Sequence, residues 1–288
     1  MDSFDAQHET GSMRTTAFSR RQLLGGAVAV GGLAVLSPGT AAASEALTRF
    51  RPKGTGGMDH RALDAILARH VKPDAERYNR VDYRSLKAGA QGALKAYVQV
   101  LEAARPSTFS SAEAHAYWVN LYNAKTLDVV LDHYPVTSIK RINLGGGGLF
   151  GSGPWSRKLM TVEGEALSLD DIEHRIVRPL FSDPMSHYAL NCASYSCPNL
   201  AAKAYTGAAI ARMMDESGRA YVNHPRGVRV SGGVITASRI YSWYAADFGG
   251  RAKLKGHWTA LAEPDLAARI APAAIGGYEY DWTLNDVR

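Results

Sequence analysis

The sequence contains few cysteines and no apolar run long enough to cross a membrane. Cys192 and Cys197 are the only cysteines among 288 residues, which excludes a scaffold held by several disulfides and a zinc site made of paired CxxC motifs. The N-terminal apolar run, Leu23–Leu36, has about 14 residues, whereas a membrane-spanning helix needs roughly 20. Beyond residue 43 the sequence also lacks internal repeats, low-complexity blocks, an HExxH motif and a phosphate-binding loop. We therefore expect a globular protein without a stable membrane anchor.

The N-terminal segment has the order of features of an export leader. Arg20 and Arg21 precede an apolar, glycine-rich run that begins at Leu23, and Ala41–Ala43 supplies small residues for cleavage. We interpret residues 1–43 as a twin-arginine signal peptide. This interpretation predicts a periplasmic or extracellular protein.

The remainder has the composition of one globular domain. Residues 44–58 contain Gly, Pro and Ser and predict a flexible lead-in, and residues 59–288 are expected to form a single domain, so that about 245 residues follow the leader. The formal net charge is +6, but basic residues are spread along the chain and often stand beside acidic ones. A diffuse excess of this kind predicts a solvated surface and no nucleic-acid partner.

Helical signals dominate the first half of the expected domain. Helices are predicted after Asp59, over residues 85–104, and between Ser110 and Pro135. Ser110 and Glu113 have the spacing of a capping box, in which each side chain bonds the other residue's backbone N–H.

Mixed signals follow in the second half. Residues 138–142 predict a short strand, Glu163-Gly164 a hairpin turn, and Ser168 with Asp171 the start of a helix that runs through Arg178. His187–Asn191 predicts a short buried strand. The fold class is therefore expected to be α+β, with several helices packed on a small, mainly antiparallel sheet.

Several ordered motifs lie between about residues 110 and 285. They are Trp118–Ala124, Leu167–His174, His187–Ser194, Ser196–Pro198, Trp243-Tyr244 with Asp247-Phe248, and Tyr280–Trp282. On these motifs the chain resembles the domain of unknown function family 547, which occurs in bacteria and plants. The resemblance implies no particular activity. In the family pattern the position matching Cys197 also accepts serine, which speaks against an obligatory disulfide.

Cys192 is the sharpest candidate for chemistry. It follows an apolar segment and precedes a turn rich in backbone N–H groups. Hydrogen bonds from these groups would stabilise a thiolate, which is the nucleophilic form of cysteine. His187 is the candidate base. On a regular strand, positions five apart point to opposite faces, so the pair meets only if the chain turns between them. The alternatives for Cys192 are a disulfide with Cys197 and a packed thiol.

Three further residues complete the candidate site. Cys197 precedes Pro198, which suits the first position of a helix whose dipole lowers a thiol pKa. Asn120 and Asn123 lie on one helix, and two roles are open for them. One amide orients the histidine, as in thiol hydrolases, or both pin a neighbouring loop to the helix.

An acidic segment offers a weaker metal hypothesis. Asp170 and His174 are four residues apart on a predicted helix, and Glu173 adds an oxygen. Acids at the start of a helix also serve as caps, and no metal motif accompanies them, so no metal residue or cofactor is assigned.

These observations support three hypotheses of function. The first is a thiol-dependent hydrolase or acyltransferase, with Cys192 as nucleophile, His187 as base and Asn123 or Asn120 as orienter, in a papain-like or transglutaminase-like arrangement. The second is a non-catalytic module that a Cys192–Cys197 disulfide stabilises and that binds an envelope peptide or polysaccharide. The third is an exported metal-binding protein.

Overall fold

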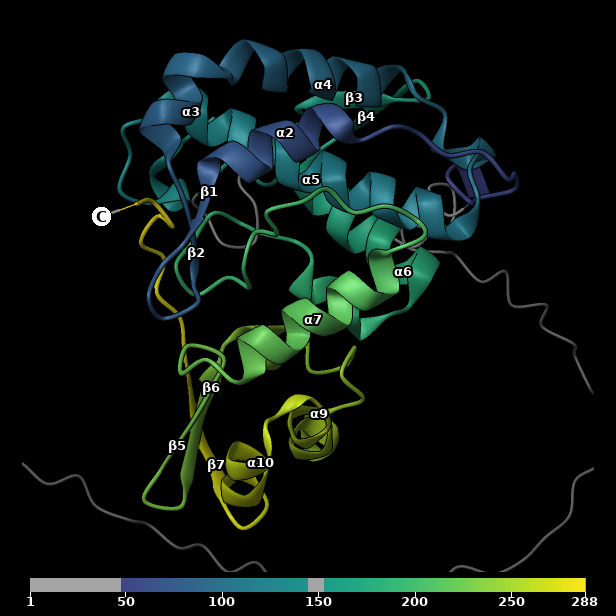
Figure 1. Cartoon of the computed structure of the whole chain (residues 1–288). Helices are drawn as coiled ribbons and strands as arrows, with labels where there is room; N and C mark the ends of the chain where they lie inside the picture. The colour runs from purple at the N-terminus through teal and green to yellow at the C-terminus, as the bar shows by residue number, and fades with distance from the viewer. Residues whose placement is uncertain (1–47, 145–152, 288) are drawn as a thin grey trace, which may run out of the picture. The chain divides into compact units, whose positions relative to one another are not determined.

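A computed structural model describes residues 48–144 and 153–287, and these lie in one compact unit. Helices make up most of the first part of this unit, and strands and short helices make up most of the second (Figure 1). The α-helices are α2 (Arg61–His70), α3 (Tyr83–Gly89), α4 (Gln91–Ala103), α5 (Ser111–His133), α6 (Arg178–Phe181), α7 (Ile210–Val222), α8 (Ile240–Trp243), α9 (Leu254–Leu261) and α10 (Pro264–Ile270). The strands are β1 (Val71–Pro73), β2 (Asn79–Val81), β3 (Met160–Val162), β4 (Glu165–Leu167), β5 (Val228–Ser231), β6 (Val234–Ser238) and β7 (Ala274–Glu279).

Helix α5 is buried on nearly every side. The Ser110 side chain accepts a hydrogen bond from the backbone N–H of Glu113, as predicted, and the helix ends at His133, two residues before Pro135. A helix that is apolar all round must lie inside a protein, because no face of it suits water. Accordingly α5 lies among α2, α3 and α4 on one side and the segment around residue 172 on the other (Figure 1).

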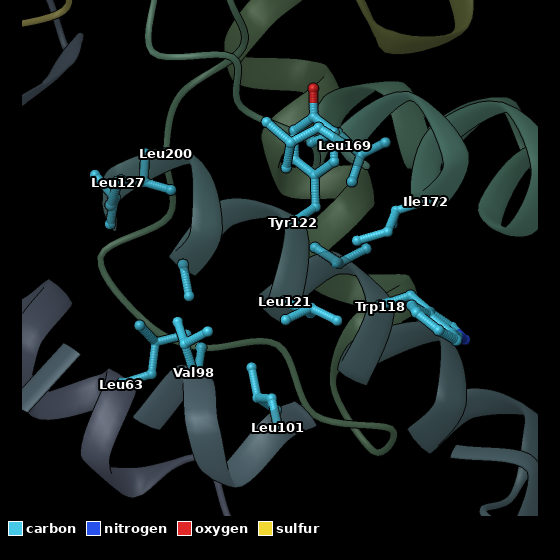
Figure 2. Close-up of a cluster of buried hydrophobic side chains, with 14 of the residues drawn as sticks. Leu63, Val98, Leu101, Trp118, Leu121, Tyr122, Leu127, Leu169, Ile172 and Leu200 are labelled. Carbon is cyan, nitrogen blue, oxygen red and sulfur yellow. The ribbon is translucent and has the colours of Figure 1, made fainter. Parts of the chain in front are cut away.

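The larger hydrophobic core surrounds α5. Trp118 and Leu121 are fully buried, and Figure 2 shows them between side chains of α2 and α4 and side chains of the segment 169–172. Burying a side chain of this size stabilises the fold by roughly 1.5–3 kcal/mol. This core therefore fixes the helix that carries Tyr122 and Asn123.

The strands form three small sheets among the described residues. β1–β2 and β3–β4 are antiparallel pairs, and the third sheet has the order β5-β6-β7 with an antiparallel and a parallel pair. A second, smaller core joins this third sheet to α7, α9 and α10. The α+β class is thus confirmed, and pairing is mainly antiparallel.

Three predicted elements are wrong. Residues 138–142 hold the 3₁₀ helix Ile139–Arg141, and His187–Asn191 overlaps the 3₁₀ helix Pro184–Tyr188. Short apolar runs are ambiguous between buried strand and buried helix, and here Ser138 and Asp183 cap helical turns. The single helix expected over 85–104 is two helices, α3 and α4, which meet at Ala90.

Among residues 48–144 and 153–287, no helix combines the length and the hydropathy that crossing a bilayer requires. The expected leader, residues 1–43, and the first four residues of the lead-in, 44–47, lie outside the described residues.

Candidate functional site

A pocket of about 520 Å³ lies where the two cores meet. Its lining combines aromatic rings, two carboxyl groups, two imidazoles and a disulfide. This volume and composition are those of a small-molecule site. The lining residues used below are Tyr122, Lys140, Trp155, Asp170, Glu173, His174, His187, Cys192, Cys197, Arg239, Trp243, Tyr244, Tyr280 and Trp282.

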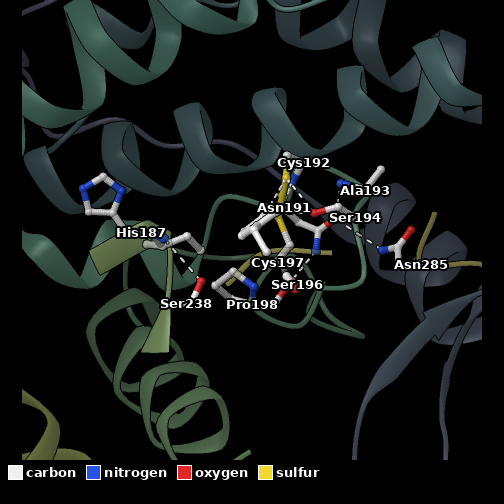
Figure 3. The surroundings of a disulfide bond; sticks show 12 residues. His187, Asn191, Cys192, Ala193, Ser194, Ser196, Cys197, Pro198, Ser238 and Asn285 are labelled. Atoms are coloured by element: carbon white, nitrogen blue, oxygen red, sulfur yellow. Dashed lines mark hydrogen bonds between the residues drawn. A yellow bond between two sulfur atoms is a disulfide. The ribbon is translucent and has the colours of Figure 1, made fainter. Parts of the chain in front are cut away.

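The disulfide between Cys192 and Cys197 forms part of the pocket wall. Cys192 is half-buried and Cys197 is buried, and the Tyr280 hydroxyl lies 3.2 Å and 3.3 Å from their respective sulfurs. Asn191 holds the loop closed: its amide donates to Pro198 O at 2.7 Å and its carbonyl accepts from Ala193 N at 2.9 Å. Figure 3 shows these contacts around the bridge. The loop is therefore fixed both covalently and by hydrogen bonds.

Two buried asparagines of α5 anchor neighbouring chain segments. Asn123 donates to Ala189 O at 2.9 Å and accepts from Asn191 N at 2.8 Å. Asn120 makes the same pair of bonds with one residue, donating to Tyr205 O at 2.8 Å and accepting from Tyr205 N at 2.9 Å. Each amide satisfies a backbone N–H and a backbone C=O that water does not reach. Asn123 thereby fixes the segment that joins His187 to Cys192.

His187 is held by a carboxylate rather than by a sulfur. Its Nε2 lies 2.7 Å from Asp247 Oδ2, and Arg178 makes two bonds to the Asp247 carboxylate, at 2.6 and 2.9 Å. The hydrogen bond from His187 and those from Arg178 hold the pKa of Asp247 far below its usual range. An ionised carboxylate only accepts, so His187 Nε2 carries the proton of this bond. The ring also stacks on Tyr244 at 4.1 Å between centroids.

Glu173 faces the second nitrogen of the same imidazole. His187 Nδ1 is 3.9 Å from Glu173 Oε1, and the Tyr122 hydroxyl donates to Oε2 at 3.5 Å. Burial and the nearby Glu173 carboxylate raise the pKa of Tyr122 and of Tyr244 well above the usual value. Both phenols therefore remain neutral donors at the pocket.

A widened helical turn presents Glu173 to the pocket. The segment Asp171–Val177 is π-helical, and Arg178 N bonds to Glu173 O, five residues back. Ser168 and Asp171 cap its start reciprocally, as predicted, with Asp171 N bonding to Ser168 Oγ at 3.1 Å. Such π-turns interrupt α-helices frequently at functional sites, because they redirect side chains.

Asp170 and His174 flank Glu173 on this turn. Asp170 Oδ1 lies 3.9 Å from His174 Nε2, and Arg178 donates to His174 Nδ1 at 3.0 Å. Burial raises the pKa of the Asp170 carboxyl. Within the described ranges, no group of three or more His, Cys, Asp or Glu side chains is arranged to hold a metal ion.

Three tryptophans and a tyrosine form an aromatic part of the pocket lining. The Trp282 ring lies 4.6 Å from Tyr280, 5.6 Å from Trp155 and 5.8 Å from Trp243, measured between centroids. Lys140 Nζ lies 5.0 Å above the Trp282 ring, within the range of a cation–π contact. The three indoles are half-buried and line the pocket. This part of the lining, called the aromatic wall below, consists of Trp155, Trp243, Tyr280 and Trp282.

The pocket draws on a family-matched segment and on the chain that follows it. Residues 106–222 match the model of the family described as "Protein of unknown function, DUF547". The matched segment is less than half of the chain, and it is similar to this family. Searches of curated proteins and of solved structures found no match. The matched segment supplies Asp170, Glu173 and His187, whereas Asp247 and Trp282 lie beyond it.

The fold brings some of the predicted site residues together. Cys192, Cys197 and His187 all line the pocket. In the described residues no hydrogen bond joins His187 to either sulfur, and Figure 3 shows its ring standing apart from the disulfide. Asn120 and Asn123 lie outside the lining, and their amides bond to backbone groups, not to a histidine.

The helix predicted after Cys197 is wrong. Residues 198–209 contain no helix, and α7 begins only at Ile210, so no helix dipole acts on the Cys197 sulfur. Instead, the Pro198 carbonyl accepts a hydrogen bond from the Asn191 side-chain amide. The proline thus closes the disulfide loop.

Sequence reasoning missed Asp247 and Arg178 as partners of His187. Asp247 lies 60 residues from His187 along the chain, and no local spacing connects them. The motif Trp243-Tyr244 with Asp247-Phe248 was the available signal in the sequence. This motif showed an acid beside aromatic residues, but it did not indicate that the acid binds His187.

Proposed function

We propose that this chain is an exported, disulfide-stabilised protein that binds a neutral glycan segment of the cell envelope in the pocket beside Cys192 and Cys197. The observation that carries the proposal is that the aromatic wall and two carboxyl groups line the same pocket of about 520 Å³. Sugar rings present C–H faces that pack on indoles, and their hydroxyls bond to carboxylates and imidazoles. Pockets that are mostly aromatic with a few polar groups orient ligands in this way.

The charges at the pocket favour an uncharged ligand. Asp170 and Glu173 contribute two carboxyl groups, and Lys140 and Arg239 contribute two cations. A strongly anionic or cationic ligand would leave one pair of charges unmatched in a partly buried site, which is costly. A neutral polyhydroxyl ligand meets both pairs with hydrogen bonds.

Calorimetry with purified protein, without its leader, tests the proposal. The probes are β-1,4-linked N-acetylglucosamine tetrasaccharide (chitotetraose) and β-1,4-linked glucose tetrasaccharide (cellotetraose), with tetra-alanine as the peptide probe. We expect one of the sugars to bind, and Trp282→Ala to weaken its affinity by about 10-fold or more, since central aromatic residues usually contribute over 1 kcal/mol to binding.

Tyr278→Ala is the matched control. Tyr278 is also half-buried near the C-terminal end, but it does not line the pocket. Its replacement is expected to leave sugar affinity within about 2-fold. Binding of tetra-alanine and of neither sugar would replace the glycan with a peptide. Binding of none of the three probes would refute the proposal.

A second candidate function, a thiol-dependent hydrolase or acyltransferase, rests on the exposure of Cys192. Its sulfur lies at the pocket, with the hydroxyls of Ser194 and Tyr280 each 3.2 Å away. Once the disulfide is reduced, such donors would stabilise a thiolate. This function requires the cysteines to be free in the active protein.

Thiol counting separates the two candidates. Titration of the protein under non-reducing conditions is expected to find no free thiol if the disulfide persists. One thiol that is alkylated unusually fast near neutral pH, lost in Cys192→Ser and slowed in His187→Ala, would favour the thiol enzyme.

A further inference from the structure

Two carboxyl groups at the pocket have different surroundings. Asp170 lies at the start of the π-helical turn with a half-exposed side chain, and its nearest titrating partner, His174, is 3.9 Å away. Glu173 has a side chain only 12% exposed, and each of its oxygens faces a polar group of Tyr122 or His187. When two carboxyl groups at one site have different environments, one usually acts as the acid and the other as the base.

Resting on the proposed function, we propose that the pocket also hydrolyses a glycosidic bond of the glycan that it binds, with Asp170 as proton donor and Glu173 as the base that activates water. Both side chains line the cavity that the aromatic wall also lines. Glycoside hydrolysis needs two carboxyl groups on either side of the scissile bond, together with surfaces that hold the sugar rings. The pocket contains two carboxyl groups and such surfaces.

The roles follow from how each group is held. Burial raises the pKa of Asp170, which is the direction that favours its role as the proton donor. Glu173 is fixed by the Tyr122 hydroxyl and is deeply buried, so we assign it to a water molecule rather than to direct attack on the sugar. Tyr244 stacks on His187 beside it and closes this side of the pocket.

The atoms of the step balance with water as the only co-reactant. The Asp170 carboxyl proton passes to the glycosidic oxygen as the bond from that oxygen to the anomeric carbon breaks. Glu173 takes a proton from water, and the water oxygen forms the new bond to the anomeric carbon. Solvent then returns a proton to Asp170 and removes one from Glu173. The products are two shorter sugars, and the new anomeric hydroxyl has inverted configuration.

Hydrolysis of chitotetraose and cellotetraose by the whole protein tests the step, with products separated by chromatography and their first anomer identified by proton NMR. We expect cleavage that gives the α-anomer first. Asp170→Asn and Glu173→Gln are each expected to lower the rate at least about 100-fold, while affinity for the tetrasaccharide changes less than about 3-fold. Glu216→Gln, an exposed acid of α7 paired with Arg212, is the control and keeps the full rate.

Each outcome decides a separate claim. Wild-type protein that binds a tetrasaccharide without cleaving it overturns hydrolysis and leaves the glycan-binding proposal standing. Cleavage that survives both carboxamide substitutions overturns the assignment of these residues, and a first product of retained configuration overturns Glu173 as a water-activating base. Asp170 is 41% exposed at its side chain, so Asp170→Asn keeps the test available if Glu173→Gln unfolds.

Discussion

Replacing Asn123 by alanine removes the amide that fixes the segment between His187 and Cys192. The substitution leaves Ala189 O and Asn191 N without partners, and these residues are 1% and 4% exposed. A buried backbone group that loses its hydrogen bond costs about 1–3 kcal/mol. We therefore expect Asn123→Ala to lower the free energy of unfolding by about 2–5 kcal/mol, and the melting temperature by about 10 °C.

Asn120→Ala is a matched control for this substitution. It also removes two buried backbone bonds, those to Tyr205, which is 1% exposed, so its loss of stability should be similar. Tyr205 does not line the pocket. Only Asn123→Ala is therefore expected to accelerate hydrogen exchange at the Asn191 amide and to weaken binding of the tetrasaccharide.

Urea unfolding followed by tryptophan fluorescence measures both variants, and exchange of the Asn191 amide is followed by NMR. A loss below about 1 kcal/mol in Asn123→Ala would refute the reasoning, because it would mean that solvent or a neighbour satisfies both groups. Equal effects of the two variants on sugar affinity would show that Asn123 acts through stability alone.

Three further predictions concern the disulfide, acid stability and export. Cys197→Ser should lower the free energy of unfolding by about 2 kcal/mol in urea titrations, since the bridge closes a loop of about six residues; an equal stability would contradict a persistent disulfide. Although burial opposes it, hydrogen bonds led by that from Lys158 lower the pKa of Asp171 to about 2. The stability that Asp171 contributes is thus full above about pH 4 and lost toward pH 2, and Asp171→Asn should flatten this part of a pH–melting curve. Replacing Arg20 and Arg21 by lysine should leave the protein in the cytoplasm on cell fractionation.

Local signals explain which elements were predictable. The Ser110 cap and the hairpin turn at Glu163-Gly164 depend on residues a few positions apart, and both were predicted. Glu163 and Gly164 have φ values of 47° and 82°, which suits a two-residue hairpin turn with both central residues in the left-handed region. Such elements need no information from the rest of the chain.

The apolar run at His187–Asn191 shows where local signals fail. Its burial was predicted, but its conformation depends on hydrogen bonds from other parts of the chain. Asp183 caps the 3₁₀ helix. Asn123 makes hydrogen bonds to the backbone groups that a neighbouring strand would otherwise have satisfied. Periodicity over five residues does not contain this information. The same holds for Asp247, whose link to His187 exists only in the folded chain.

The charges around His187 also explain why the pocket needs more than the segment that matches the DUF547 model. Arg178 and His187 lie within residues 106–222, and both bond to Asp247 in the segment after α8. Without Asp247, a buried imidazole and a guanidinium would face each other with no carboxylate between them, which is unfavourable in a partly buried site. Most of the aromatic wall also comes from the later segment. The matched residues therefore supply the acids, and the C-terminal part supplies both the carboxylate that holds His187 in place and most of the surface on which a sugar would stack.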